Sequence, residues 1–318
     1  MIKDYIPIKN FKEGISVKGF FLCTEKHLRY TKSGDLFLDL ELRDITGRIS
    51  AKIWNNVELL DKKFESGNAI VVSGNVESFI GKLQLIIKKI NKATVQYYSR
   101  YGFDPGLIVP KSKKNPKKMW NQIEILINGI KNKHNQILLR SIFKENKKQI
   151  MYFPASVNTY YNFRSGFLEH LVGVGKLAKK ISVLYNVDQD LVLTGSLLYN
   201  IGVLKGINSN FEFDYTKVGK LIGNCILGRD LVIKYAKKIK NFPEKILIKL
   251  DHIILSVNNS KDLEKSSLSS FPEAILVKMI VLIDIKMSIM EGLINEDQDS
   301  GDFTSKYNYF GIPIMKND

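Results

Sequence analysis

Hydrophobic and polar residues alternate with a period of two through the first third of the chain. In "DLFLDLELRD" (residues 35–44) four leucines share one face, while Phe37, Asp39, Glu41 and Arg43 share the other. The run "RISAKIWN" (residues 48–55) alternates in the same way. Such alternation is typical of strands buried on one side. Similar runs in "ISVKGFFLCTEKHLRYT", "AIVVSGNV" and "KLQLIIKKI" bring the predicted strands of residues 14–91 to five.

The order of these strands indicates a small barrel. The first strand is long and contains a glycine, and residues 56–66 favour a short helix between the third and fourth strands. Five strands with a helix in that place are the order of an OB-fold, an open barrel that often binds single-stranded nucleic acid. We therefore predict a five-stranded OB-fold domain over residues 1–97.

The pattern changes after the barrel. Residues 98–118 carry three prolines, two glycines and a run of lysines, which predicts a basic linker. A lysine run of this kind is typical of a solvated surface, and beside a nucleic-acid-binding domain it can also contact phosphate. From Met119 apolar residues recur at three- and four-residue spacing, as in "GFLEHLVGVGKLAKKISVLY". Residues 119–318 are predicted to form an all-α domain.

Charge and composition narrow the class of partner. The chain has a net charge of +16 and a pI of about 9.5, which favours a polyanionic partner such as nucleic acid. An AT-rich genome, which enriches lysine, would produce the same excess. No signal-peptide core and no apolar run of membrane-spanning length is present, and the two cysteines have no metal-ligand spacing. We expect a cytoplasmic protein without a membrane partner.

The stretch "GSLLYNIGVLKG" (residues 195–206) places a polar pair and a glycine in an apolar helical region. Helical phosphohydrolases of the HD superfamily typically read "LLHDIGK" here, about thirty residues after a lone histidine. The stretch resembles that motif, with Tyr199 and Asn200 in place of the His-Asp pair and His170 as the preceding histidine.

Four further segments extend the resemblance along almost the whole chain. They are "GDLFLDLELRDITGRISAKIWN", "MYFPASVNTYYNFRSGFLEHLVGVGKLAKKI", "LDHIILSVNN" and "PEAILVKMIVLIDIKM". Their order and spacing are similar to those of the YhaM family of bacterial 3'-to-5' exoribonucleases, in which an OB-fold precedes an HD domain. The resemblance implies an HD-type fold for the helical domain.

The metal positions implied by the resemblance are mostly changed. His170 and His252 match family histidines, and Asp284 fits a common aspartate of the last helix. The remaining positions carry Tyr160 and Tyr161, Tyr199 and Asn200, Asn224, Val257 and Asn258, and Val281. Tyrosine stays protonated at neutral pH and asparagine offers only a neutral oxygen, so we interpret the site as a vestigial metal centre and expect no cofactor. One alternative is a weak divalent-metal site at His170, His252 and Asp284. Another is that His170 and His252 are hydrogen-bonded histidines of the core.

The outward faces of the predicted strands carry aromatic rings between cations. The predicted nucleic-acid-binding residues are Phe37, Arg43, Arg48, Lys52, Trp54, Lys82 and Lys88, with Gln84 beside them. Bases stack on rings while lysine and arginine follow the phosphates. Alternatively, Trp54 packs on the linker or the helical domain.

These observations predict a protein that binds RNA or single-stranded DNA and has lost the HD metal site. Two alternatives stay open. The first is an active metal-dependent exonuclease that uses His170, His252 and Asp284. The second is a non-catalytic regulatory subunit whose helical domain is the surface for a protein partner or a homo-oligomer.

Overall fold

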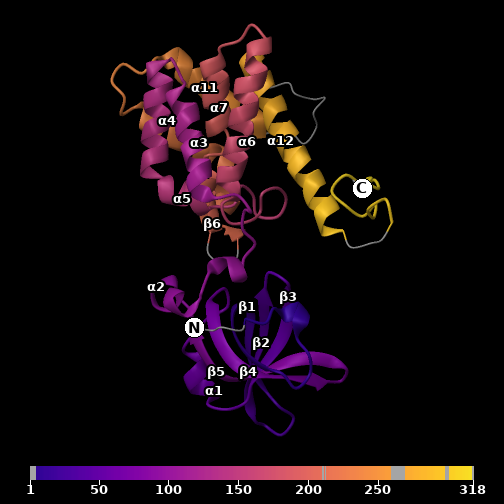
Figure 1. Cartoon of the computed structure of the whole chain (residues 1–318). Coiled ribbons are helices and arrows are strands. Elements are labelled where there is room, and N and C mark those ends of the chain that lie inside the picture. The colour runs from indigo at the N-terminus through magenta and orange to yellow at the C-terminus, as the bar shows by residue number, and fades with distance from the viewer. Residues whose placement is uncertain (1–4, 210, 212, 259–268, 298–300, 317–318) are drawn as a thin grey trace. The chain divides into compact units, whose positions relative to one another are not determined.

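The computed structural model describes residues 5–209, 211, 213–258, 269–297 and 301–316. The chain forms two compact units, which are considered separately (Figure 1). The barrel unit extends to Lys111, and the helical unit begins at Ser112.

The barrel unit is a closed five-stranded barrel, as the sequence predicts. Its strands are β1 (Ser16–Tyr30), β2 (Leu36–Asp44), β3 (Gly47–Ile53), β4 (Ala69–Phe79) and β5 (Lys82–Lys92), in the order β1-β2-β3-β5-β4. The short 3₁₀ helix η1 (Ile8–Asn10) precedes them, and α1 (Val57–Asp61) lies between β3 and β4. The parallel pairing of β3 with β5 closes the barrel, which gives the OB-fold topology.

The length of β1 allows it to serve both of its neighbours. Its first half pairs with β4 through residues 16–22, and its second half pairs with β2 through residues 22–30. An irregularity between Cys23 and Glu25 lies where the strand passes from one partner to the other. Inside the barrel, Leu38, Leu40 and Leu42 of β2 are buried, which confirms the face assigned by their alternation.

The segment after β5 folds onto the outside of the barrel. It contains α2 (Val95–Tyr98) and the 3₁₀ helices η2 (Ser99–Tyr101) and η3 (Pro105–Leu107). Tyr98 and Phe103 pack on Phe20 of β1, with ring centroids 6.0 and 4.8 Å away. Phe20 is an outward-facing aromatic residue that is only 1% exposed, so it needs this cover. Residues 98–111 of the predicted linker therefore belong to the barrel unit.

The helical unit contains one apolar core. Its larger helices are α3 (Pro116–Asn128), α4 (Lys133–Glu145), α5 (Lys147–Tyr152), α6 (Gly166–Ile181), α7 (Gln189–Leu198), α10 (Asn224–Ala236), α11 (Glu244–Asn258) and α12 (Pro272–Glu296). Shorter elements are η4 (Ser182–Leu184), α8 (Val203–Gly206) and α9 (Lys217–Ile222). Each of the larger helices contributes buried apolar residues to the core.

The unit also contains a feature that the helical pattern does not predict. Strands β6 (Ile207–Ser209) and β7 (Phe213–Tyr215) form a two-stranded antiparallel pair, because α8 ends at Gly206 and the backbone of Ile207 is extended. None of the helices in the described ranges combines the length and hydrophobicity needed to cross a bilayer.

Candidate nucleic-acid interface and candidate metal centre

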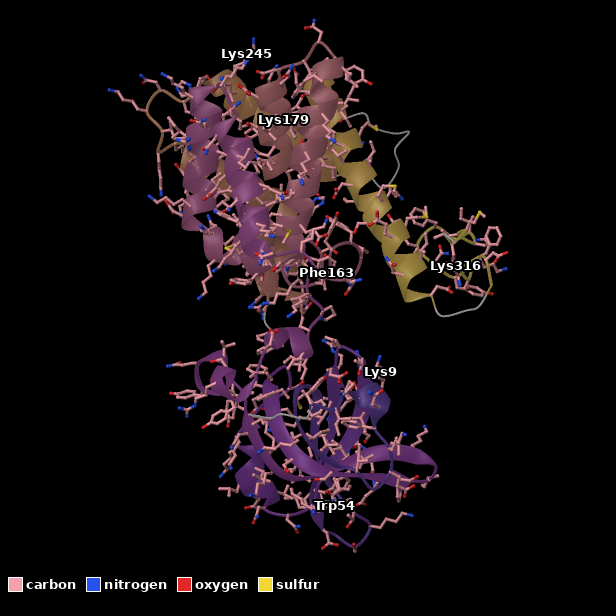
Figure 2. The ribbon with its side chains drawn as sticks, in the orientation of Figure 1. Lys9, Trp54, Phe163, Lys179, Lys245 and Lys316 are labelled. Carbon is pink, nitrogen blue, oxygen red and sulfur yellow. The ribbon has the colours of Figure 1, made fainter. Side chains whose placement is uncertain are left out.

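The outer face of β2 and β3 carries a stacked aromatic pair. The register pairs Leu38 with Ile53, which brings Phe37 beside Trp54. Their rings stack with centroids 4.7 Å apart and an interplanar angle of 25°. Trp54 lies at the barrel surface and is 43% exposed (Figure 2). The ammonium of Lys52 lies 5.2 Å from the centroid of the Phe37 ring. The structure thus joins three of the predicted residues into one platform, in which Trp54 is exposed and Phe37 and Lys52 are half-buried.

Cations on this face are paired with acidic neighbours. Lys52 Nζ lies 2.5 Å from an oxygen of Asp39, and Arg48 lies 2.6 Å from Glu41. The pKa of Glu41 is lowered, first by the hydrogen bond that the Thr24 hydroxyl donates to it and then by Arg48. The nucleic-acid-binding face predicted from the sequence includes its cations but not these carboxylates, although Asp39 and Glu41 lie on the same outward face of β2. The ion pairs reduce the positive field of the face.

The other predicted residues lie elsewhere on β2, β3 and β5. Arg43 lies opposite Arg48 in the β2–β3 register. Gln84 of β5 pairs with Ser50 of β3, and Lys82 is exposed at the beginning of β5. Lys88 is exposed at an irregularity of the β4–β5 pairing. The parallel β3–β5 pairing is what brings β5 to the edge of the β2–β3 face.

His170 of α6 is the centre of a buried polar cluster in the helical unit. Its side chain is fully buried, and Nδ1 lies 2.6 Å from Oδ2 of Asp284 on α12. Its Nε2 contacts the hydroxyl of Tyr199, which follows α7 and is 2% exposed. The rings of Tyr160 and Tyr161 lie 5.5 and 5.3 Å from the imidazole. Two predicted metal positions, His170 and Asp284, therefore meet, enclosed by tyrosines.

Protonation in this cluster follows from burial. Burial raises the pKa of Tyr199 well above its ordinary value and raises the pKa of Tyr160 to about 12. The Tyr199 phenol is therefore protonated at neutral pH and can donate to Nε2 of His170. A carboxylate only accepts hydrogen bonds, so Nδ1–H donates to Asp284. In this arrangement neither ring nitrogen has a lone pair free for a metal ion.

Asp284 is held by further contacts. Tyr161 donates a hydrogen bond to it, and burial is the largest cause of the raised pKa of Tyr161, followed by the charge of Asp284. At Gly173 of α6 an added Cβ would lie 2.0 Å from Oδ1 of Asp284. Only glycine leaves room for this approach of the α12 carboxylate to α6.

The other positions that the sequence assigns to a vestigial site make different contacts. Asn200 donates to the carbonyl of Ala155 at 3.1 Å, and Val281 is part of the apolar core. Asn224 begins α10 and Val257 packs at the edge of the core. The side chain of Asn258 lies outside the described part of the chain.

His252 is not brought to His170. Its Nε2 accepts a hydrogen bond from the backbone N–H of Ser270 at 3.1 Å, and its ring lies 5.1 Å from that of Phe271. Within the residues that the structure describes, no three His, Cys, Asp or Glu side chains are arranged to hold a metal ion. The three-ligand site considered from the sequence does not form among these residues.

Comparison with known proteins agrees with the barrel and with the motifs. Residues 24–93 match the model of a family described as an OB-fold nucleic acid binding domain, so the barrel unit carries a domain of that class.

Over almost its whole length the chain is similar to proteins named 3'-5' exoribonuclease YhaM. The one from Shouchella clausii is 26% identical over 94% of this chain and 92% of its own length. The one from Halalkalibacterium halodurans is 27% identical over 93% and 91%. These matches confirm the resemblance that the motifs indicate.

Solved structures include the second OB-fold domain of replication protein A from Methanococcus maripaludis. It is 21% identical, covers 28% of this chain and 94% of its own, and has a TM-score of 0.24.

Proposed function

We propose that this protein binds single-stranded RNA or DNA on the outer face of β2 and β3 and does not hydrolyse it with a metal ion. The observation that carries the proposal is the stack of the half-buried Phe37 with the exposed Trp54 on an OB-fold domain. Bases stack on such rings whatever their sequence, and each stacked base contributes roughly 1–3 kcal/mol.

The charge of the chain supports the same partner. Lys82, which the β3–β5 register places level with Arg48 on the same face, forms no ion pair with any residue that the structure describes, and the net charge of the chain is +16. Lys52 and Arg48 are held by Asp39 and Glu41, so they contribute less attraction for phosphate than unpaired cations would. The free thiols of Cys23 and Cys225 are compatible with the cytoplasmic setting that we propose.

Binding without hydrolysis is supported by the cluster around His170. Both of its ring nitrogens are engaged, by Asp284 and by Tyr199. The second candidate function, a metal-dependent 3'-to-5' exoribonuclease, is favoured by the names of the relatives. The two candidates differ in whether the purified protein shortens RNA.

A salt titration tests binding. The protein is titrated with 12-mers of rU and dT at several salt concentrations, and four phosphate contacts on a single strand would give a log–log slope of about −3. Trp54→Ala should weaken binding by about 1–3 kcal/mol with little change in slope. Lys82→Ala should reduce the slope by about 0.7. Tyr307→Ala is the matched control, because Tyr307 is an exposed aromatic residue of the helical unit.

Absence of binding at low salt would contradict the proposal and favour the role of a subunit that binds a protein partner. Equal losses in Trp54→Ala and Tyr307→Ala would exclude the β2–β3 face.

Hydrolysis is tested with end-labelled RNA and added Mn²⁺. We expect no shortening and no stoichiometric Mn, Fe or Mg in the purified protein. Shortening that EDTA abolishes, and that is lost in Asp284→Asn, would establish the exoribonuclease instead.

A further inference from the structure

The barrel unit has a second concave surface, away from the β2–β3 platform. A pocket of about 880 Å³ lies on the outer face of β1, β4 and β5. The register places Phe20, Val71 and Asn91 in one row across these three strands. Val71 and Asn91 line the pocket, while Phe20 is buried beneath Tyr98. The volume lies within the range of small-ligand sites.

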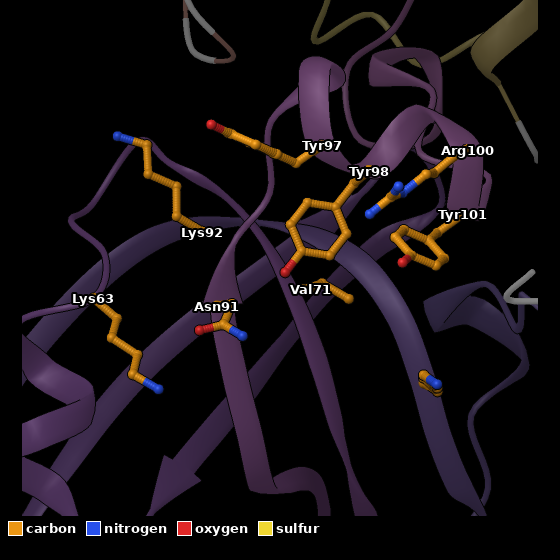
Figure 3. A pocket seen from close by; sticks show the side chains of 9 residues that line it. Lys63, Val71, Asn91, Lys92, Tyr97, Tyr98, Arg100 and Tyr101 are labelled. Carbon is orange, nitrogen blue, oxygen red and sulfur yellow. The ribbon is translucent and has the colours of Figure 1, made fainter.

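Tyrosines of α2 and η2 form one wall of this pocket. Tyr98 packs edge-on against Phe20, and Tyr101 lies 6.0 Å from Tyr98. Tyr97 is 63% exposed. Figure 3 shows Tyr98 projecting over Asn91 and Val71, with Tyr101 beside it. Packing on the barrel therefore holds Tyr98 in place, while Tyr97 stays exposed and can contact a planar group.

Four cations surround the same space, namely Lys18, Lys63, Lys92 and Arg100. Among the described residues that line the pocket, none is acidic. None of the four cations forms an ion pair with a residue in the described ranges, although the guanidinium of Arg100 lies 4.9 Å from the centroid of the Tyr101 ring. In Figure 3, Lys63 and Lys92 lie on one side of Tyr98 and Arg100 lies on the other.

The two surfaces of the barrel thus differ in their charge. On the β2–β3 face, Lys52 and Arg48 are neutralised by carboxylates at 2.5 and 2.6 Å. The cations around the pocket have no such partner, so their charge is available to an anion. Like charges gathered without a counter-ion raise the local anion concentration.

We propose that this pocket binds a nucleotide, with its phosphate held by the cations and its base against the tyrosine wall. An aromatic group joined to a phosphate matches both features, whereas inorganic phosphate would use only the first. The nucleotide is either a free mononucleotide or one unit of a bound strand. The pocket shares no residue with the Phe37–Trp54 platform, so the proposal does not depend on that face.

The test uses the full-length protein and calorimetric titration with 5'-AMP, inorganic phosphate and a 12-mer of rU. Lys63→Ala/Lys92→Ala and Tyr97→Ala alter the pocket at exposed positions. Lys12→Ala/Lys62→Ala removes the same charge from exposed positions outside it. Tyr97→Phe keeps the ring.

We expect the double lysine variant of the pocket to weaken AMP binding at least about tenfold at low salt. In the 12-mer titration it should lower the salt slope by about 1.4. Tyr97→Ala should weaken binding about 5- to 140-fold. The control double variant and Tyr97→Phe should resemble the wild type. Pocket-dependent binding of AMP identifies a free nucleotide as the ligand, and pocket-dependent binding of the 12-mer alone identifies a unit of a strand.

Unchanged binding of both ligands in the pocket variants would overturn the proposal, as would inorganic phosphate competing as strongly as AMP. Strand binding that depends on Trp54, with neither AMP binding nor strand binding dependent on the pocket, would leave the proposed function intact and refute the pocket. Strand binding that depends on the pocket but not on Trp54 would support the pocket and contradict binding on the β2–β3 face.

Discussion

Replacing Tyr199 by phenylalanine tests the interpretation of the buried cluster. The change removes one oxygen and keeps the ring, so the surrounding core stays filled. It leaves Nε2 of His170 without its partner at a site where the imidazole is fully buried and Tyr199 is 2% exposed. An unsatisfied buried acceptor costs about 1–3 kcal/mol. We expect the helical unit to lose stability by that amount.

The two tryptophans allow each unit to be observed separately. Trp54 lies in the barrel unit, whereas Trp120 is 5% exposed in the core of the helical unit. In a Trp54→Phe background, tryptophan fluorescence during urea unfolding therefore reports the helical unit. With a urea dependence of about 2 kcal/mol per molar, the midpoint should fall by about 1 M.

Tyr235→Phe is the matched control. Tyr235 is also in the helical core and 5% exposed, and its hydroxyl donates to Glu145 at 2.6 Å. Glu145 is itself exposed, so water can replace the lost donor and the change should cost under about 1 kcal/mol. If Tyr199→Phe lowers stability no more than Tyr235→Phe does, the hydroxyl does not satisfy His170 and the reasoning is refuted.

Three further outcomes are expected. Tyr199→His combined with Asn200→Asp should not produce nuclease activity, because the other changed metal positions would still lack ligands. RNA degradation by this variant that a chelator abolishes would contradict this expectation. Gly202→Ala should destabilise the helical unit by more than about 2 kcal/mol, because the added Cβ would lie 1.8 Å from a backbone oxygen of α10. Overpacking costs about 1–3 kcal/mol even where side chains can move aside. Urea unfolding measures the loss of stability, and an unchanged stability would contradict the close approach of Gly202 to α10. The pKa of Glu41 is lowered below its ordinary value of 4.5, chiefly by the hydrogen bond from Thr24. Its carboxylate therefore stabilises the barrel above pH 4.5, and this stabilisation is lost as the pH falls. Glu41→Gln should make thermal unfolding of the barrel less sensitive to acid, and an unchanged pH profile would refute this role of Glu41.

Local patterns in the sequence were enough to predict the strands and their inward faces. The alternation of Leu38, Leu40 and Leu42 assigns one side of β2 to the core, because successive side chains of a strand point to opposite faces. For the same reason the sequence places Phe37 and Trp54 on outward faces. Its resemblance to the HD motif predicts that Tyr199 and Asn200 stand at the positions of the His-Asp pair.

The contacts between these residues depend on the tertiary structure. Register brings Phe37 against Trp54 and Asp39 against Lys52, and neither pairing follows from alternation within one strand. The segment after β5 reads as a linker because its prolines and lysines are local signals, whereas the need to cover Phe20 arises only once the barrel has closed. His170 meets Tyr199 and Asp284 across 29 and 114 residues of chain. Periodicity specifies which face of a helix is buried, but the packing of α6 against α7 and α12 decides which polar groups on those faces become partners.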